Sequence, residues 1–209
     1  AHDTQPYLLE PFMNQQVAYD SEFYISIALH GYDDPGLRAI WLDPAKDPAP
    51  IWDQKPLPFG IPSSFPDGRP PGVPEHFVAY CLNYAFFPFY PLMMRVFMLP
   101  LALAGLNPIA TAALAGVVVS LLGALGAMLA LYSLVSHRLQ HSGALKAAFY
   151  LVAFPTGFFL AVVHTEGLFV GLAFGSLALL QRKRWLWAAL LAAGAALTRA
   201  VGGALIIPF

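Results

Sequence analysis

Charged residues are scarce in this sequence of 209 residues. Asp, Glu, Lys and Arg make up 11% of it, 58% is hydrophobic, and the mean hydropathy is +0.61. Soluble domains carry about 25% charged residues, so this composition is too apolar for a water-facing surface. The formal net charge of -1 provides no basic excess, which argues against nucleic acid as a partner. The composition indicates an integral membrane protein.

Cysteine is almost absent as well. The single Cys81 excludes an internal disulfide, and no Cys/His cluster has the spacing of zinc ligands. We therefore expect no metal and no cofactor. The sequence has no initiator Met and no signal segment, and residues 202–209 are still apolar where it stops. From these ends we expect a fragment of a longer protein.

Proline is concentrated in one segment, residues 33–80, which contains 11 of the 19 prolines. This density excludes long helices and central strands, so it predicts an extended loop. A loop of this length is typically functional or disordered. Residues 15–29, before it, are the best candidate for a short helix. We expect residues 1–85 to form an extracytoplasmic loop region.

Beyond residue 84 the sequence is overwhelmingly apolar. A membrane-spanning helix needs about 20 mainly apolar residues, and residues 109–135 meet this requirement after a helix start at Asn107 and Pro108. Shorter apolar runs follow at 145–163, 168–180 and 185–197. The four-residue spacing of Gly167, Gly171 and Gly175 predicts close helix packing there. Residues 107–209 are therefore predicted to be the transmembrane helices of an all-α polytopic membrane protein.

Two basic clusters give the orientation. They are His137 to Lys146 and Arg182 to Arg184, and both should face the cytoplasm. His164, Glu166 and Arg199 then lie on the outer side. A membrane-spanning helix at residues 86–106 would place the first basic cluster on the non-cytoplasmic side. The prolines and Arg95 of this segment also do not suit a spanning helix. We therefore expect an interfacial or re-entrant segment there.

Four polar constellations stand out against this background. Asp20 and Glu22 lie among aromatic and aliphatic residues, where a partly desolvated acid can act as a general base; the alternative is a solvated surface pair. The sequence FFPFYP at 86–91 suits the head-group zone, and simple anchoring there is the alternative.

The other two constellations are FPT at 154–156 with HTE at 164–166, and LTR at 197–199. An ionisable residue inside an apolar run is by default a functional hypothesis, although Glu166 could also cap a hairpin in water. Pro155 should break the helix and shape a cavity. Arg199 could hold a phosphate through its planar fork or extend to the interface, and Arg95 has the same two alternatives.

In this order the four blocks resemble the PIG-V type of mannosyltransferase, a branch of the GT-C membrane glycosyltransferases. The matching positions are Asp20, Tyr24, Ile27-Ala28, Gly31-Tyr32, 86–91, 154–159, Thr165-Glu166 and 197–199. They extend over nearly the whole chain. Tyr19, His164 and Ala200 depart from the Trp, Tyr and Pro of the family pattern.

The resemblance implies a GT-C-like helix bundle that transfers a hexose, with mannose expected, from a polyprenyl- or dolichyl-phosphate donor to an acceptor hydroxyl with inversion. The bacterial plasma membrane or the ER membrane would hold it, with the site extracytoplasmic or lumenal. Membrane lipids and the lipid-linked donor are the expected partners. Asp20 would be the catalytic base. The implied substrate-binding residues are Glu22, Tyr24, Tyr90, Arg95, His164, Glu166 and Arg199.

Two other classes stay open. A transporter would place ionisable residues near mid-membrane, often in repeated halves, whereas here they lie at the predicted outer ends and no internal repeat is visible. A non-catalytic membrane scaffold is the third reading. Transfer of labelled mannose from a lipid-phosphate donor would distinguish all three.

Overall fold

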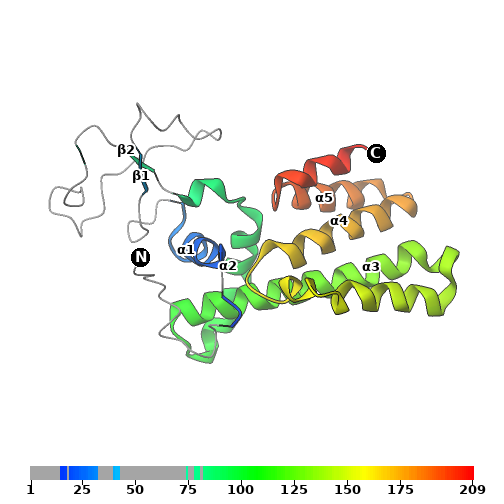
Figure 1. The fold of residues 1–209 in the computed structure, drawn as a ribbon, viewed down its shortest axis with the longest axis horizontal. Coiled ribbons are helices and arrows are strands. Elements are labelled where there is room, and N and C mark those ends of the chain that lie inside the picture. The colour runs from blue at the N-terminus through cyan, green and yellow to red at the C-terminus, as the bar shows by residue number, and fades with distance from the viewer. Residues whose placement is uncertain (1–14, 18, 33–39, 43–73, 75–77, 81) are drawn as a thin grey trace.

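The computed structural model describes residues 15–17, 19–32, 40–42, 74, 78–80 and 82–209. In chain order the elements are α1 (Ser21–His30), β1 (Ile40–Leu42), β2 (Val78–Tyr80), η2 (Leu82–Ala85), α2 (Phe89–Leu101), η3 (Ala102–Ala104), α3 (Pro108–Ala153), η4 (Gly157–Leu160), α4 (Thr165–Gln181), α5 (Trp185–Ala196) and η5 (Ala200–Ile206). Helices dominate, as the sequence predicted, and α3 runs beside α4 (Figure 1).

The two short strands pair antiparallel, with Ile40 opposite Tyr80 and Leu42 opposite Val78. They lie near the two ends of the predicted proline-rich loop, so this segment contains a short strand near each end. The predicted loop residues 33–39, 43–73 and 75–77 lie outside the described residues.

The predicted short helix at 15–29 forms six residues later, as α1. Of the described residues before it, 15, 16, 19 and 20 are in turns, and Tyr19 has a positive φ of 54°. This backbone conformation is uncommon for a residue with a side chain, and it is incompatible with a helix that begins at residue 15.

α3 consists of two helices that meet at Gln140. It begins where the sequence predicted: the Asn107 side chain accepts a hydrogen bond of 2.8 Å from the amide of Ala110, and Pro108 occupies the first turn. Gln140 then breaks the helix, with φ 58° and ψ 177°, and the chain turns back (Figure 1).

The part of α3 before Gln140 contains the predicted segment 109–135. In the described chain, α3 is the one helix long and apolar enough to cross a membrane, with a mean hydropathy of 2.4 over an 18-residue stretch. The helices α2, α4 and α5 are apolar but have 13, 17 and 12 residues. Each is shorter than the about 20 residues of a typical span.

The apolar run 145–163 is not a continuous helix. α3 ends at Ala153, because Pro155 disfavours helical geometry in the residue before it, and Phe154 is accordingly extended with ψ 145°. The short turn η4 and an irregular stretch then lead to α4. The break predicted at Pro155 is confirmed, while the expected helical run through Val163 is wrong.

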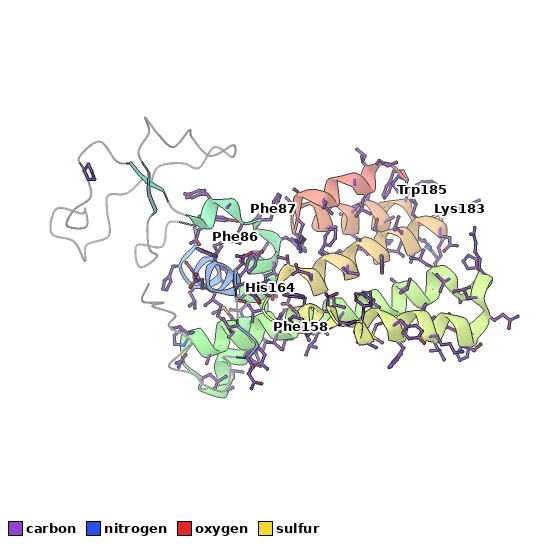
Figure 2. The ribbon with its side chains drawn as sticks, in the orientation of Figure 1. Phe86, Phe87, Phe158, His164, Lys183 and Trp185 are labelled. Atoms are coloured by element: carbon purple, nitrogen blue, oxygen red, sulfur yellow. The ribbon has the colours of Figure 1, made fainter. Side chains whose placement is uncertain are left out.

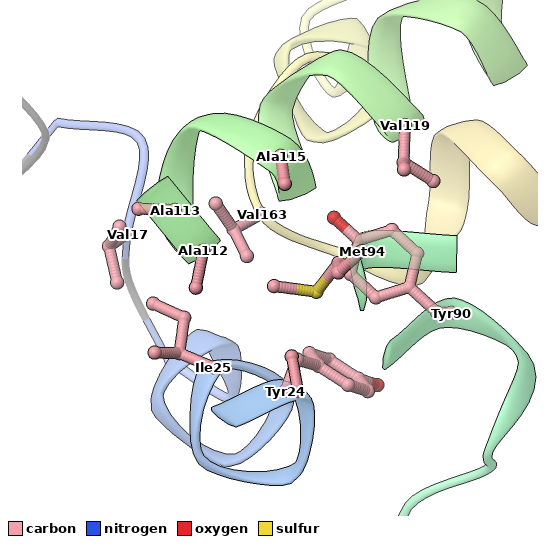
Figure 3. Close-up of a cluster of buried hydrophobic side chains, with 11 residues drawn as sticks. Val17, Tyr24, Ile25, Tyr90, Met94, Ala112, Ala113, Ala115, Val119 and Val163 are labelled. Atoms are coloured by element: carbon pink, nitrogen blue, oxygen red, sulfur yellow. The ribbon is translucent and has the colours of Figure 1, made fainter. Parts of the chain in front are cut away.

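The buried core joins α1, α2 and the start of α3. Figure 3 shows Tyr24 and Ile25 of α1 facing Met94 and Tyr90 of α2. Small side chains of α3, among them Ala112 and the neighbouring alanines, complete the cluster, so the helices approach closely. The segment predicted as interfacial or re-entrant therefore packs as a helix over α1 and α3.

Glycines let α3 and α4 touch through their backbones. A Cβ atom built on Gly123 would lie 2.4 Å from the carbonyl oxygen of Gly167, and one on Gly171 would lie 2.4 Å from that of Gly123. The close helix packing predicted from the spacing of Gly167, Gly171 and Gly175 is thus confirmed at the first two positions. A Cβ atom built on Gly175 would instead lie 2.9 Å from a side-chain atom of Leu191.

Candidate functional site

An ion pair joins the third and fourth constellations. Nη1 of Arg199 donates to Oε1 of Glu166, and it also lies 3.5 Å from the Thr165 hydroxyl. Glu166 lies in the first turn of α4, where the helix dipole favours a carboxylate. Arg199 lies in extended geometry between the end of α5 and the start of η5. The ion pair therefore joins the first turn of α4 to the segment that follows α5. The structure therefore brings these two predicted residues together.

His164 lies beside the same carboxylate. It is 7% exposed, and its Nδ1 is 3.8 Å from Oε2 of Glu166. That Oε2 atom is buried and has no hydrogen-bond partner among the described residues. Glu166 thus holds the cation with one oxygen and keeps the other as an acceptor.

Tyr24 connects this group to α1. Burial raises the pKa of Tyr24 to about 12, although a hydrogen bond with Thr165 lowers it in part. The charges of Asp20, Glu166 and Arg199 also act on the Tyr24 hydroxyl. Tyr24, Glu166 and Arg199 are therefore joined through Thr165. Asp20 stands between Tyr19, whose ring lies 6.3 Å from that of His164, and Ser21, whose hydroxyl donates to the Val163 carbonyl at 2.8 Å, so it lies beside the same group. Asp20, Tyr24, His164, Glu166 and Arg199 are called the outer cluster, after the side of the membrane on which the sequence predicts them.

Asp20 is the exposed member of the outer cluster. It is the N-cap residue of α1, yet its side chain makes no capping hydrogen bond. The preceding Tyr19 is 74% exposed, and its ring lies 6.3 Å from that of His164. A positive φ at Tyr19, directly before this carboxylate, is the kind of local strain often found at functional sites.

Backbone contacts hold the four constellations in place. The Val163 amide donates to the Gln16 carbonyl at 2.9 Å, and the buried Ser21 hydroxyl donates to the Val163 carbonyl at 2.8 Å. On the other side, the Phe89 amide donates to the Leu197 carbonyl at 3.1 Å. Each block is thus tied to another that is distant in sequence.

Tyr90 is enclosed in the core. It is 0% exposed, and its hydroxyl lies 2.9 Å from both the Gly116 carbonyl and the Ser120 hydroxyl. Ser120 in turn donates to the His164 carbonyl at 3.0 Å. Tyr90 thus supports the backbone of His164 through Ser120, and the substrate contact predicted for it stays a prediction.

Arg95 lies at the opposite end of α1 from Asp20. Its Nε and Nη2 donate to the carbonyls of Ala28 and Ile27, at 2.7 and 2.9 Å. These carbonyls belong to the last turn of α1, which needs such partners. The structure thus gives Arg95 a helix-capping position outside the outer cluster, and this argues against the phosphate contact predicted for it.

Glu22 was also predicted to bind substrate, whereas several residues around the outer cluster were not predicted. Glu22 lies in the first turn of α1 and is half-buried; its substrate role stays a prediction. Ser21 and Ser120 were missed, because a lone serine in an apolar segment carries no distinctive signal. Thr165 could have been found, since it stands inside the HTE block.

An apolar pocket opens where the helix breaks at Pro155. Its volume is about 540 Å³, and α3 residues such as Leu125 and Met128 face Phe154, Pro155 and Phe158 across it. The ring of Phe158 contacts that of Phe159, which lies 5.6 Å from His164. The cavity expected from Pro155 is thus present, and one aromatic residue separates it from the outer cluster. Figure 2 shows Phe158 and His164 near each other.

No group of His, Cys, Asp and Glu among the described residues has the arrangement of a metal site. No family model matches the chain, and no match to it was found among the curated proteins or the solved structures. The resemblance to the PIG-V type of mannosyltransferase therefore stays a prediction.

Proposed function

We propose that this chain is part of a multi-pass membrane glycosyltransferase with a GT-C-like bundle. It transfers a hexose, with mannose expected, from a polyprenyl- or dolichyl-phosphate donor to an acceptor hydroxyl. The observation that carries the proposal is the outer cluster: the ion pair of Glu166 and Arg199 lies beside His164, and Asp20 directly follows Tyr19, whose ring is 6.3 Å from that of His164.

Asp20 is the proposed base. Its exposed carboxylate accepts the proton of the acceptor hydroxyl, whose oxygen attacks the anomeric carbon in line. The bond between that carbon and the donor phosphate breaks, so the configuration inverts and the phosphate leaves with the lipid. Neither a metal nor a cofactor is part of this proposal.

Arg199 stabilises the leaving phosphate. A guanidinium fork matches phosphate geometry, and 42% of this side chain is exposed even with Glu166 attached. Glu166 holds the fork in position. The Oε2 of Glu166, which has no hydrogen-bond partner among the described residues, is the proposed acceptor for a sugar hydroxyl, and His164 is a second nitrogen donor beside it.

The charge distribution supports a membrane orientation. Hydrogen bonds join the end of α4 to α3 near His137, so the two basic clusters lie together at the end remote from the outer cluster (Figure 2). Basic loops face the cytoplasm, so the outer cluster faces the opposite side. Proposed spans are the first part of α3, α4 and α5, with the apolar pocket at Pro155 available to the isoprenoid of the donor.

The decisive experiment replaces Asp20 by Asn in the full-length protein. This change removes the base but keeps the size of the side chain, so we expect loss of labelled-mannose transfer from a lipid-phosphate donor. An unchanged melting temperature is the control for folding. Near-normal turnover of the variant would remove Asp20 from the catalytic role, and no transfer by the wild type would favour a transporter or a scaffold.

A second experiment tests the phosphate contact. We expect Arg199→Ala to weaken binding of a non-transferable lipid-phosphate analogue by about tenfold or more, since a charged hydrogen bond contributes about 1.5–3 kcal/mol. Arg199→Lys should recover part of the affinity. An unchanged affinity in the Ala variant would assign Arg199 to ion pairing alone.

A further inference from the structure

Two basic segments meet at the end of the bundle remote from the outer cluster. Nη2 of Arg182 donates to the Ser133 hydroxyl at 2.8 Å, and the Gln181 amide nitrogen lies 2.6 Å from Nε2 of His137. The turn at Gln140 thereby comes next to the end of α4. Figure 2 shows Lys183 and Trp185 at this end, far from His164.

In the described chain, no acidic residue of the same segments balances the positive charge of this end. Five exposed cations belong to it: Arg138, Lys146, Arg182, Lys183 and Arg184. The acidic residues that the structure describes are Asp20, Glu22 and Glu166, and none of them lies in these basic segments. Five like charges, with no described carboxylate in the same segments, attract an external anion.

A polar pocket lies between the two basic segments. Its volume is about 500 Å³, and its polar lining consists of Tyr132, Ser133, Ser136, His137, Gln181 and Arg182. These side chains include several N–H and O–H donors and no carboxylate. Such a lining suits a phosphate oxygen.

Two tryptophans indicate which phosphate would reach this pocket. Trp185 and Trp187 directly follow the basic run and are 56% and 60% exposed. Exposed tryptophans next to basic residues are typical of the membrane interface, and basic pockets at the cytoplasmic side of helices bind anionic lipid head groups.

We propose that this basic end binds the phosphate head group of an anionic lipid, with Arg182 and His137 in the pocket and Arg138 and Lys183 at its rim. The inference rests on the membrane orientation within the proposed function, but not on sugar transfer. It assigns the second end of the bundle to the lipid of the cytoplasmic leaflet.

Tryptophan quenching tests the proposal. The full-length protein, with its other tryptophans replaced by Phe (Trp41 and Trp52 among them), is placed in bilayers of phosphatidylcholine and phosphatidylglycerol. Brominated phosphatidylglycerol should quench Trp185 and Trp187 more strongly than brominated phosphatidylcholine. Each cation near the surface contributes about a fivefold factor, so Arg182→Gln should lower the relative association constant about fivefold and Arg182→Lys should preserve it.

Arg138→Gln is the second variant, because it leaves the hydrogen bond between Arg182 and Ser133 in place. Equal quenching by the two brominated lipids, or unchanged constants in both Gln variants, would overturn the proposal. Loss of the preference in 10 mM inorganic phosphate would also overturn it, in favour of a free phosphate. Failure to recover the protein with the vesicles would instead refute the membrane orientation, and mannose transfer, measured separately, tests the proposed catalysis alone.

Discussion

The contact between α3 and α4 gives a sharp prediction about stability. In Gly123→Ala, the new Cβ atom would lie 2.4 Å from the Gly167 carbonyl oxygen and 2.5 Å from the Leu168 Cα atom. Ordinary contacts of a Cβ atom begin at 3.4 Å, so the two helices must separate locally by about 3.4 − 2.4 = 1.0 Å. Both clashing atoms belong to backbone, which has no alternative rotamer.

Gly126→Ala is the matched control. Gly126 lies one turn along the same helix, and a Cβ atom there meets nothing within 4 Å. Both variants gain the same helix propensity, about 1 kcal/mol, so this contribution cancels in the comparison. What remains is the cost of overpacking, about 1–3 kcal/mol.

The assay is thermal unfolding of the two variants and the wild type in one detergent, followed by circular dichroism. For a chain of this size 1 kcal/mol corresponds to about 2–4 °C, so Gly123→Ala should melt about 2–12 °C below Gly126→Ala. Equal melting temperatures would refute the close backbone contact. Because Gly167 follows Glu166, a loss of sugar transfer should accompany the loss of stability.

Two further predictions concern the outer cluster. Ser21→Ala removes the buried donor to the Val163 carbonyl and should destabilise the protein by about 1–3 kcal/mol, measured as a lower melting temperature; an unchanged value would mean that this bond does not hold α1 in place. The raised pKa of Tyr24 means that the folded state binds the phenolic proton more tightly than the unfolded state. Its contribution to stability is therefore complete below pH 10 and is lost as the pH rises to about 12. Absorbance at 295 nm should lose a titration step near pH 12 in Tyr24→Phe, and a step lost near pH 10 would contradict the burial.

Local rules predicted much of the helical part of the fold. The start of α3 follows from Asn107 and Pro108, its C-terminal end follows from Pro155, and its contact with α4 follows from the glycine spacing. Each depends on backbone geometry within a few residues. Sequence reasoning failed at residues 15–20, because the left-handed Tyr19 that delays α1 has no local cause such as glycine.

The chemically unusual residues can be recognised from the order of amino acids alone: they are a few ionisable side chains within apolar runs, such as Glu166 and Arg199, and two basic clusters. Their surroundings in the folded chain depend on how the helices pack. Tyr90 and Arg95 belong to the same conspicuous part of the sequence, yet one is enclosed in the core and the other caps α1. Burial and hydrogen bonds between segments as much as 142 residues apart arise from packing, and no pattern within a single segment encodes that packing.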